Sequence, residues 1–138
     1  IGAGQRCLEL ACQRVEDRET FGKKLSQHQS IRENIAKSYA ELEMARLLVH
    51  KTCWHIDHHG VKPSIELISA TKISVPLMVQ AIIDRCMQMH GAGGLTEDWC
   101  MAEQFNYARW CRQADGPDEV HQMALGKRII QQYAEASA

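Results

Sequence analysis

Residues 65–89 are apolar around nearly the whole circumference of the helix that they would form. A helix that is hydrophobic on every side is normally buried on every side, so this stretch is predicted to be the central helix of a bundle. Ser64 is the predicted N-cap, with Glu66 in the first turn, where negative charge suits the helix dipole. Pro76 lies inside the stretch and is expected to kink it. Its apolar residues are Leu67, Ile68, Ile73, Val75, Leu77, Met78, Val79, Ile82, Ile83, Cys86 and Met87.

The other long segments, residues 4–16, 31–56, 97–112 and 117–136, also show helical spacing of apolar residues. No run alternates apolar and polar side chains over a useful length, so strands are not expected. The chain is therefore predicted to be one all-α domain, an up-and-down helical bundle of four to five helices. The predicted inner face of the last helix consists of Val120, Met123, Ala124, Ile130 and Tyr133.

Charge and cysteine content exclude several classes of protein. The 138 residues carry 16 Lys and Arg against 17 Asp and Glu, so a basic nucleic-acid-binding arm is excluded and no nucleic-acid partner is expected. No apolar run is expected to reach the roughly 18 residues of a membrane span, and no signal-peptide core is present. The six cysteines are expected to be buried, reduced thiols of an intracellular protein. Because the chain does not begin with Met, we expect it to be a fragment of a longer protein.

The first candidate site is the polar stretch at residues 17–25. Arg18 can bind two oxygens of a phosphate through its guanidinium, and the Thr20 hydroxyl can donate a third hydrogen bond. Phe21 offers a flat surface for a ring, and His28 and Gln29 follow shortly after. The alternative is a solvated, charged loop with a packed Phe.

The second candidate is the glycine-rich stretch at residues 87–94. Glycines allow a backbone to approach a ligand closely, and their exposed N–H groups suit pyrophosphate. The glycines here follow a helix, whereas the phosphate-binding fingerprint of nucleotide-binding folds runs strand, loop, helix, so that fingerprint is rejected. The alternative is a glycine that simply ends the helix.

The third candidate is the break at residues 114–121. Asp115 stands before Gly116, outside the predicted helix, where its carboxylate is free to point at a ligand. Asp118 and Glu119 fall in a first helical turn, which favours negative charge. The alternative is an ordinary helix start.

A fourth group consists of histidines near residues 50–59, with Cys53 and Asp57. Their spacing of three and four residues could bring metal ligands to one helix face. No second cluster matches it, so no metal ligand is assigned, and a polar helix end is the favoured interpretation.

Together, the three interruptions resemble one family in their order and spacing. Residues 18–25 with His28-Gln29 look like the Arg-x-x-Phe-Gly segment of the acyl-CoA dehydrogenases, and residues 88–94 look like their Gln-x-x-Gly-Gly segment. Residues 115–120 look like the Glu-Gly-Thr-x-x-Ile segment. The chain thus resembles the C-terminal helical domain of that family over nearly its whole length. The sequence Asp-Gly-Pro-Asp-Glu-Val-His is similar to the branch with a fused aminoglycoside-kinase-like region.

The resemblance implies an FAD-dependent dehydrogenase whose N-terminal helical and middle β-domains are absent from this chain. Asp115 would be the catalytic base and Gly116 would lie by the substrate thioester. It implies acyl-CoA as substrate, an electron-transfer flavoprotein as acceptor, and a homo-oligomer: a tetramer when complete, and a dimer for the fragment. The implied cofactor-binding residues are Arg18, Thr20, Phe21, His28, Gln29, Gln88, Gly91, Ala92, Pro117 and Asp118.

Three departures from the family pattern bear on these expectations. The base is Asp115 where most members have Glu, Pro117 replaces a threonine that donates to the flavin, and Ala92 replaces a glycine. Because of Asp115 and Pro117, the chain could instead belong to an oxidase branch of the superfamily that uses Asp as base, and this alternative stays open. A catalytically silent helical scaffold and a metal- or haem-binding bundle are further alternatives. The expected location is mitochondrial or peroxisomal in a eukaryote and otherwise cytoplasmic, and the fragment alone is expected to be inactive.

Overall fold

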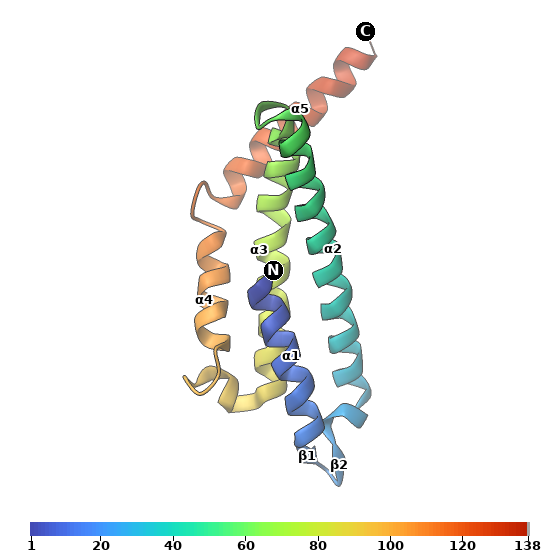
Figure 1. The fold of residues 1–138 in the computed structure, drawn as a ribbon, viewed down its shortest axis with the longest axis vertical. Coiled ribbons are helices and arrows are strands. Elements are labelled where there is room, and N and C mark those ends of the chain that lie inside the picture. Colours follow the sequence, from blue (N-terminus) through green and yellow to red (C-terminus); the bar gives the residue numbers. More distant parts are fainter. Residues whose placement is uncertain (138) are drawn as a thin grey trace.

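The computed structural model describes residues 1–137 and has five α-helices in that range (Figure 1). Helices α1 to α4 run alternately down and up along one long axis, as predicted for an all-α up-and-down bundle. The helices are α1 (Gly2–Asp17), α2 (Gln29–His59), α3 (Ile65–His90), α4 (Met101–Cys111) and α5 (Asp118–Ala136). The connections contain strands β1 (Glu19–Thr20) and β2 (Lys23–Lys24) and 3-10 helices η1 (Leu25–Gln27), η2 (Lys62–Ser64) and η3 (Gly91–Leu95).

Helix α3 is the centre of the bundle, as its sequence predicts. It contacts α1, α2, α4 and α5, and its fully buried Ile82, Ile83 and Cys86 form the middle of the core. The expectation of burial on every side is wrong, because Leu77 is 48% exposed and many other residues of α3 are only half-buried. The neighbouring helices of this chain cover only part of its apolar circumference.

The start of α3 differs from the prediction in the role of its cap. Ser64 occupies the N-cap position, but its hydroxyl donates to the Gly60 carbonyl at 2.6 Å and contacts His55 Nδ1 at 2.8 Å instead of capping α3. Its side chain therefore ties the end of α2 to η2. Farther along, α3 continues past Pro76 as one helix.

The predicted inner face of α5 is wrong. Val120 is 50% exposed, Met123 70% and Tyr133 73%, and Ala124 and Ile130 are exposed as well. An amphipathic pattern indicates that one face of a helix is apolar, but it does not indicate which other element covers that face. Helix α5 contacts α3, with Gln132 Nε2 still donating to Glu66 Oε1 at 2.5 Å, and its C-terminal end then extends beyond the end of the bundle (Figure 1).

Two expectations from composition also need correction. The segment Lys62–Leu95 has a window with a mean hydropathy of 1.4, so by length and composition alone it could cross a membrane. It contains the central helix of this bundle, and a core helix meets the same criterion. All six cysteines are free within the described chain, but only Cys7 and Cys86 are buried, whereas Cys12 and Cys53 are exposed.

Candidate functional site

A short β-hairpin joins α1 to η1 and carries the first motif. Strands β1 and β2 pair antiparallel, with Thr20 opposite Lys23. The two turn residues, Phe21 and Gly22, both have positive φ, at 52° and 77°, which is typical of a two-residue hairpin turn. The turn holds Phe21 out into solvent, where it is 98% exposed. The sequence signalled the interruption but not the hairpin.

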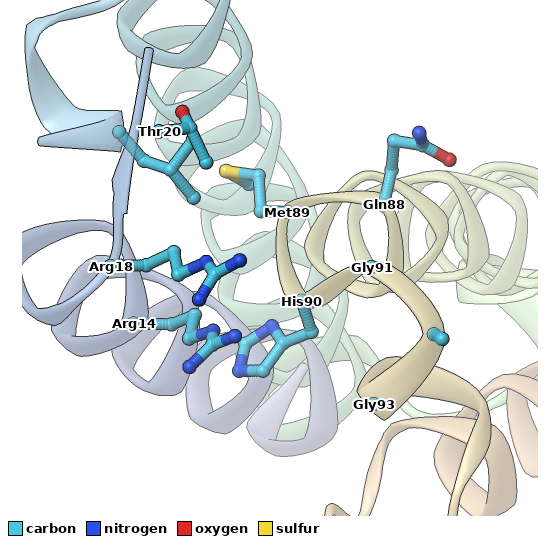
Figure 2. A pocket seen from close by; sticks show the side chains of 10 residues that line it. Arg14, Arg18, Thr20, Gln88, Met89, His90, Gly91 and Gly93 are labelled. Atoms are coloured by element: carbon cyan, nitrogen blue, oxygen red, sulfur yellow. The ribbon is translucent and has the colours of Figure 1, made fainter. Parts of the chain in front are cut away.

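A pocket of about 420 Å³ lies between this hairpin, the end of α1 and the end of α3 (Figure 2). It brings the first two motifs together although they are far apart in the sequence. Arg18 and Thr20 line one side, and Gln88, Gly91 and Ala92 line the other. The remaining lining residues are Arg14, Leu25, Met89, His90 and Gly93.

The charge of this pocket is positive. Arg14, in the last turn of α1, and Arg18, just after that helix, both line it, and both side chains extend toward it in Figure 2. Neither arginine forms an ion pair with a carboxylate in the part of the chain that the structure describes. Two adjacent cations without an acidic partner repel one another and favour the binding of an anion.

The glycines shape the far wall. Gly91 has φ +63°, which a side chain rarely adopts, and a Cβ there would point into open space. At Gly94 a Cβ would lie 2.7 Å from the Met87 carbonyl oxygen, so only glycine allows η3 to fold back against α3. The glycines thus allow the backbone to turn sharply here, and the wall of the pocket at Gly91 carries no side chain.

His90 is the buried polar residue of this pocket. Its side chain is 4% exposed and packs edge-on against Trp99, with ring centroids 4.7 Å apart. Nδ1 donates to the Cys86 carbonyl at 2.8 Å, and Nε2 has no partner among residues 1–137. Burial lowers the pKa of His90, the hydrogen bond to the Cys86 carbonyl acts in the opposite direction, and the Arg14 charge lowers the pKa further.

Three residues of the first motif lie outside this pocket. Phe21 points into solvent, and the ring of His28 lies 3.5 Å from the Thr20 hydroxyl. The Gln29 amide donates to Glu33 at 2.7 Å along α2. In this chain these side chains therefore line no common cavity with Arg18.

The third motif forms a separate loop between α4 and α5. Asp115 and Gly116 both have positive φ, at 56° and 101°. A second pocket, of about 390 Å³, lies beside Asp115 between α3 and α4. Its lining residues are Thr71, Lys72, Val75, Pro76, Tyr107, Trp110, Cys111, Ala114 and Asp115.

Hydrogen bonds from α3 and α5 hold this loop. Lys72 Nζ donates to the Cys111 carbonyl at 2.6 Å and to the Gly116 carbonyl at 3.1 Å. His121 Nε2 donates to the Asp115 carbonyl at 3.2 Å, which leaves Nδ1 to accept from Ser69 at 3.4 Å. The backbone of Asp115 is thus clamped while its side chain stays exposed.

Asp118, also predicted to bind the cofactor, is engaged within the chain. Arg112 Nε donates to its Oδ2 at 2.7 Å, and Arg112 also donates to Gln80 at 3.1 Å. Asp118 is 6% exposed and its Oδ1 lacks a partner. Pro117, the N-cap residue of α5, is exposed.

Sequence reasoning missed four residues of these two sites: Arg14, His90, Lys72 and Arg112. Arg14 lies in the last turn of α1 and Arg18 follows the helix in extended conformation, so the spacing of four residues did not reveal that both line one pocket. Lys72 was visible as one of two cations, with Arg85, in an otherwise apolar helix. The roles of His90 and Arg112 depend on contacts that spacing does not reveal.

The histidines of α2 do not form a metal site in residues 1–137, where no group of three or more candidate ligands lies together. His58 Nδ1 donates to the Trp54 carbonyl at 2.8 Å, and its ring stacks on Trp54.

Comparisons with known proteins identify the family of this chain. The family model of the acyl-CoA dehydrogenase C-terminal domain matches residues 1–130. Acyl-CoA dehydrogenase family member 11 of Gallus gallus is 42% identical over 127 residues, covering 92% of this chain and 16% of that protein. Family member 10 of Mus musculus is 44% identical over 127 residues, covering 92% of this chain and 12% of that protein.

A solved structure shows the same fold. A glutaryl-CoA dehydrogenase from Mycobacterium smegmatis, crystallised in complex with FADH2, is 29% identical with a TM-score of 0.87. The match covers 93% of this chain and 33% of that one, so the chain spans a third or less of the length of these three relatives. The chain belongs to the acyl-CoA dehydrogenase family and corresponds to its C-terminal domain. The relation to a branch with a fused kinase-like region stays a prediction.

Proposed function

We propose that this chain is the C-terminal part of an FAD-dependent acyl-CoA dehydrogenase, in which it binds the adenosine-diphosphate part of FAD and supplies the catalytic base. The observation that carries the proposal is the pocket in which Arg18 and Thr20 meet Gln88 and Gly91. These residues come from two motifs that the family resemblance links to the same cofactor.

The pocket fits a diphosphate group by its own chemistry. Arg14 and Arg18 supply two unpaired guanidinium groups, and guanidinium binds phosphate oxygens in pairs. Gly91 leaves the backbone accessible because no side chain stands there. Gln88 is exposed at the rim and adds an amide that can both donate and accept.

The loop at the other site fits the role of a base. The carboxylate of Asp115 is exposed beside the second pocket, and Lys72 and His121 hold the backbone around it. We propose that Asp115 takes the α-proton of a bound acyl thioester, whose carbonyl polarisation makes that proton acidic. FAD, when bound, supplies the acceptor for the hydride that leaves the β-carbon. Exclusion of water around Asp115 by a bound acyl chain keeps the carboxylate basic.

The rest of the enzyme is part of the same proposal. The remaining domains, a homotetrameric assembly, an electron-transfer flavoprotein as acceptor, and a mitochondrial, peroxisomal or cytoplasmic location follow from the family resemblance. Phe21 and the apolar face of α5 are exposed in this chain, which supports contacts with another domain or subunit. Asp at position 115 also suits the Asp-based oxidase branch, which oxygen consumption with a nitroalkane would distinguish from acyl-CoA dehydrogenation.

Flavin retention tests the proposed binding site. Arg18→Ala in the complete protein removes a charge-assisted phosphate contact and should weaken FAD binding about 10- to 100-fold. The measurement is the ratio of flavin absorbance to protein after dialysis. Lys23→Ala is the matched control, because Lys23 is an exposed cation of the same hairpin that does not line the pocket. Equal flavin content in both variants would contradict the role of Arg18.

A further inference from the structure

The hydrogen bonds of His90 determine which of its nitrogens carries the proton. The Cys86 carbonyl oxygen can only accept, so Nδ1 must be the N–H that donates to it at 2.8 Å. In the neutral ring Nε2 is then an unprotonated acceptor, and it is buried without any partner. A buried acceptor that lacks a donor costs free energy, so a ligand that supplies a donor to this atom would recover part of that cost.

The missing partner of Nε2 must be a hydrogen-bond donor. Burial lowers the pKa of His90, so the ring stays neutral near pH 7. The lone pair of a neutral Nε2 repels phosphate oxygens, which are themselves acceptors. The guanidinium groups of Arg14 and Arg18 in the same pocket can only donate hydrogen bonds. The pocket is therefore suited to bind an anion at the two arginines and a hydroxyl group at His90 Nε2.

We propose that His90 Nε2 accepts a hydrogen bond from a ribose hydroxyl of a nucleoside diphosphate whose phosphates lie on Arg14 and Arg18. This inference rests on the proposed function and makes it more specific, because it adds Arg14 and His90 to the binding site and assigns opposite hydrogen-bonding roles to them. Simple pyrophosphate would use the two arginines and leave Nε2 unpartnered.

The route to Nε2 passes Arg14. In Figure 2 the Arg14 guanidinium lies beside the His90 ring, and it is at the flexible end of a long side chain. A diphosphate draws this guanidinium toward itself through charge-assisted hydrogen bonds. Because Nε2 is buried in this structure, the proposed contact requires this movement of Arg14 to open the side of the ring that carries Nε2.

The first test uses the unaltered chain and three probes: ADP, inorganic pyrophosphate and 2′,3′-dideoxy-ADP. We expect ADP to bind about threefold to tenfold more tightly than dideoxy-ADP, the usual worth of one neutral hydrogen bond. In ¹⁵N NMR of the imidazole, ADP should shift the Nε2 resonance, and pyrophosphate and dideoxy-ADP should not produce that shift. Equal affinity for ADP and dideoxy-ADP would overturn the role of His90.

The second test uses variants. His90→Phe should weaken ADP binding about threefold to tenfold and leave pyrophosphate and dideoxy-ADP binding unchanged. His58→Phe is the matched control, because His58 makes the same Nδ1 contact to the carbonyl four residues earlier but lies outside the pocket. Equal loss for ADP and dideoxy-ADP in His90→Phe would overturn the inference.

The outcomes separate this inference from the proposed function. If neither ADP nor pyrophosphate shifts the resonances of Arg14 and Arg18, the pocket is not a diphosphate site and both ideas fail. If both probes bind but the Nε2 resonance does not respond to ADP, only the role of His90 fails.

Discussion

The pocket at the end of α3 and the loop between α4 and α5 differ in how their cationic side chains are paired, although each site also has one buried polar atom without a partner among residues 1–137, His90 Nε2 and Asp118 Oδ1. In the pocket, Arg14, Arg18 and His90 Nε2 have no charged or hydrogen-bonding partner within the described chain. In the loop, Lys72 and His121 bond the backbone. Lys72 and Gln88 mark the two sites on one helix, about 24 Å apart at 1.5 Å per residue.

This contrast indicates a division of tasks. For the groups left without partners in the pocket, we propose a ligand that supplies them, an anion that carries a hydroxyl group. A backbone clamped by internal hydrogen bonds holds one exposed carboxylate in a fixed place, as a base requires. The predictions below each disturb one site and leave the other intact.

The largest effect is expected at the loop. Asp115→Asn keeps the size and removes the base, so flavin reduction by substrate in the complete protein should fall about 10²- to 10⁴-fold. Asp115→Glu should stay active, because it restores the carboxylate that most family members carry. Stopped-flow bleaching of the flavin is the measurement. Bleaching of Asp115→Asn at the wild-type rate would mean that the base lies elsewhere.

At the pocket the largest structural effect is expected from a glycine. Gly94→Ala places a Cβ against the Met87 backbone and should destabilise the chain by about 1–3 kcal/mol. Gly126→Ala in exposed α5 meets nothing within 4 Å and should stabilise it by about 0.5–1 kcal/mol. Urea denaturation compares the two variants. Similar midpoints would show that η3 does not pack on α3 in this way.

Removing the lysine clamp should loosen the loop. Lys72→Met leaves two carbonyls without their donor and should cost about 1–2 kcal/mol, with faster hydrogen exchange of the Asp118 amide. Lys72→Arg should restore most of the protection. Lys62→Met, at an exposed cation in η2, is the control. If the Asp118 amide exchanged at the same rate in Lys72→Met, this would contradict the idea that the hydrogen bonds of Lys72 hold the loop.

The smallest expected effect is the contribution of the buried thiols Cys86 and Cys7 to the pH dependence of stability. Burial raises the pKa of Cys86 from 9.0 to about 12, and burial together with neighbouring thiols does the same for Cys7. Unfolded thiols ionise first, so stability should fall as the pH rises from about 9 toward 12. Cys86→Ala should flatten this decline in urea denaturation, whereas Cys53→Ala, at an exposed thiol, should not. An equal decline in both variants would contradict this origin.

The fold was predictable from the sequence to the extent that local patterns determine it. The apolar circumference of residues 65–89 correctly predicted the central helix, because no other position in a bundle accommodates such a helix. The same reasoning failed for Met123 and Tyr133 of α5, whose apolar face has no cover within this chain. Ser64 failed as a cap because a nearby carbonyl and His55 compete for its hydroxyl.

The candidate site was predictable as three motifs but not as an arrangement. Spacing could not show that Arg18 and Gln88 line one pocket while Asp115 lies beside another, since that depends on how the helices fold back on each other. Nor could it show that the Asp118 carboxylate is paired with Arg112. Contacts between distant residues decided both points.

One measurement on two variants tests the division of tasks most directly: flavin content and the rate of flavin reduction per bound flavin, in Arg18→Ala and Asp115→Asn of the complete protein. The account predicts a crossed result, in which Arg18→Ala loses flavin but reduces the remainder at nearly the wild-type rate, and Asp115→Asn keeps its flavin but reduces it slowly. A loss of both properties in both variants, or an exchange of the two phenotypes, would contradict it.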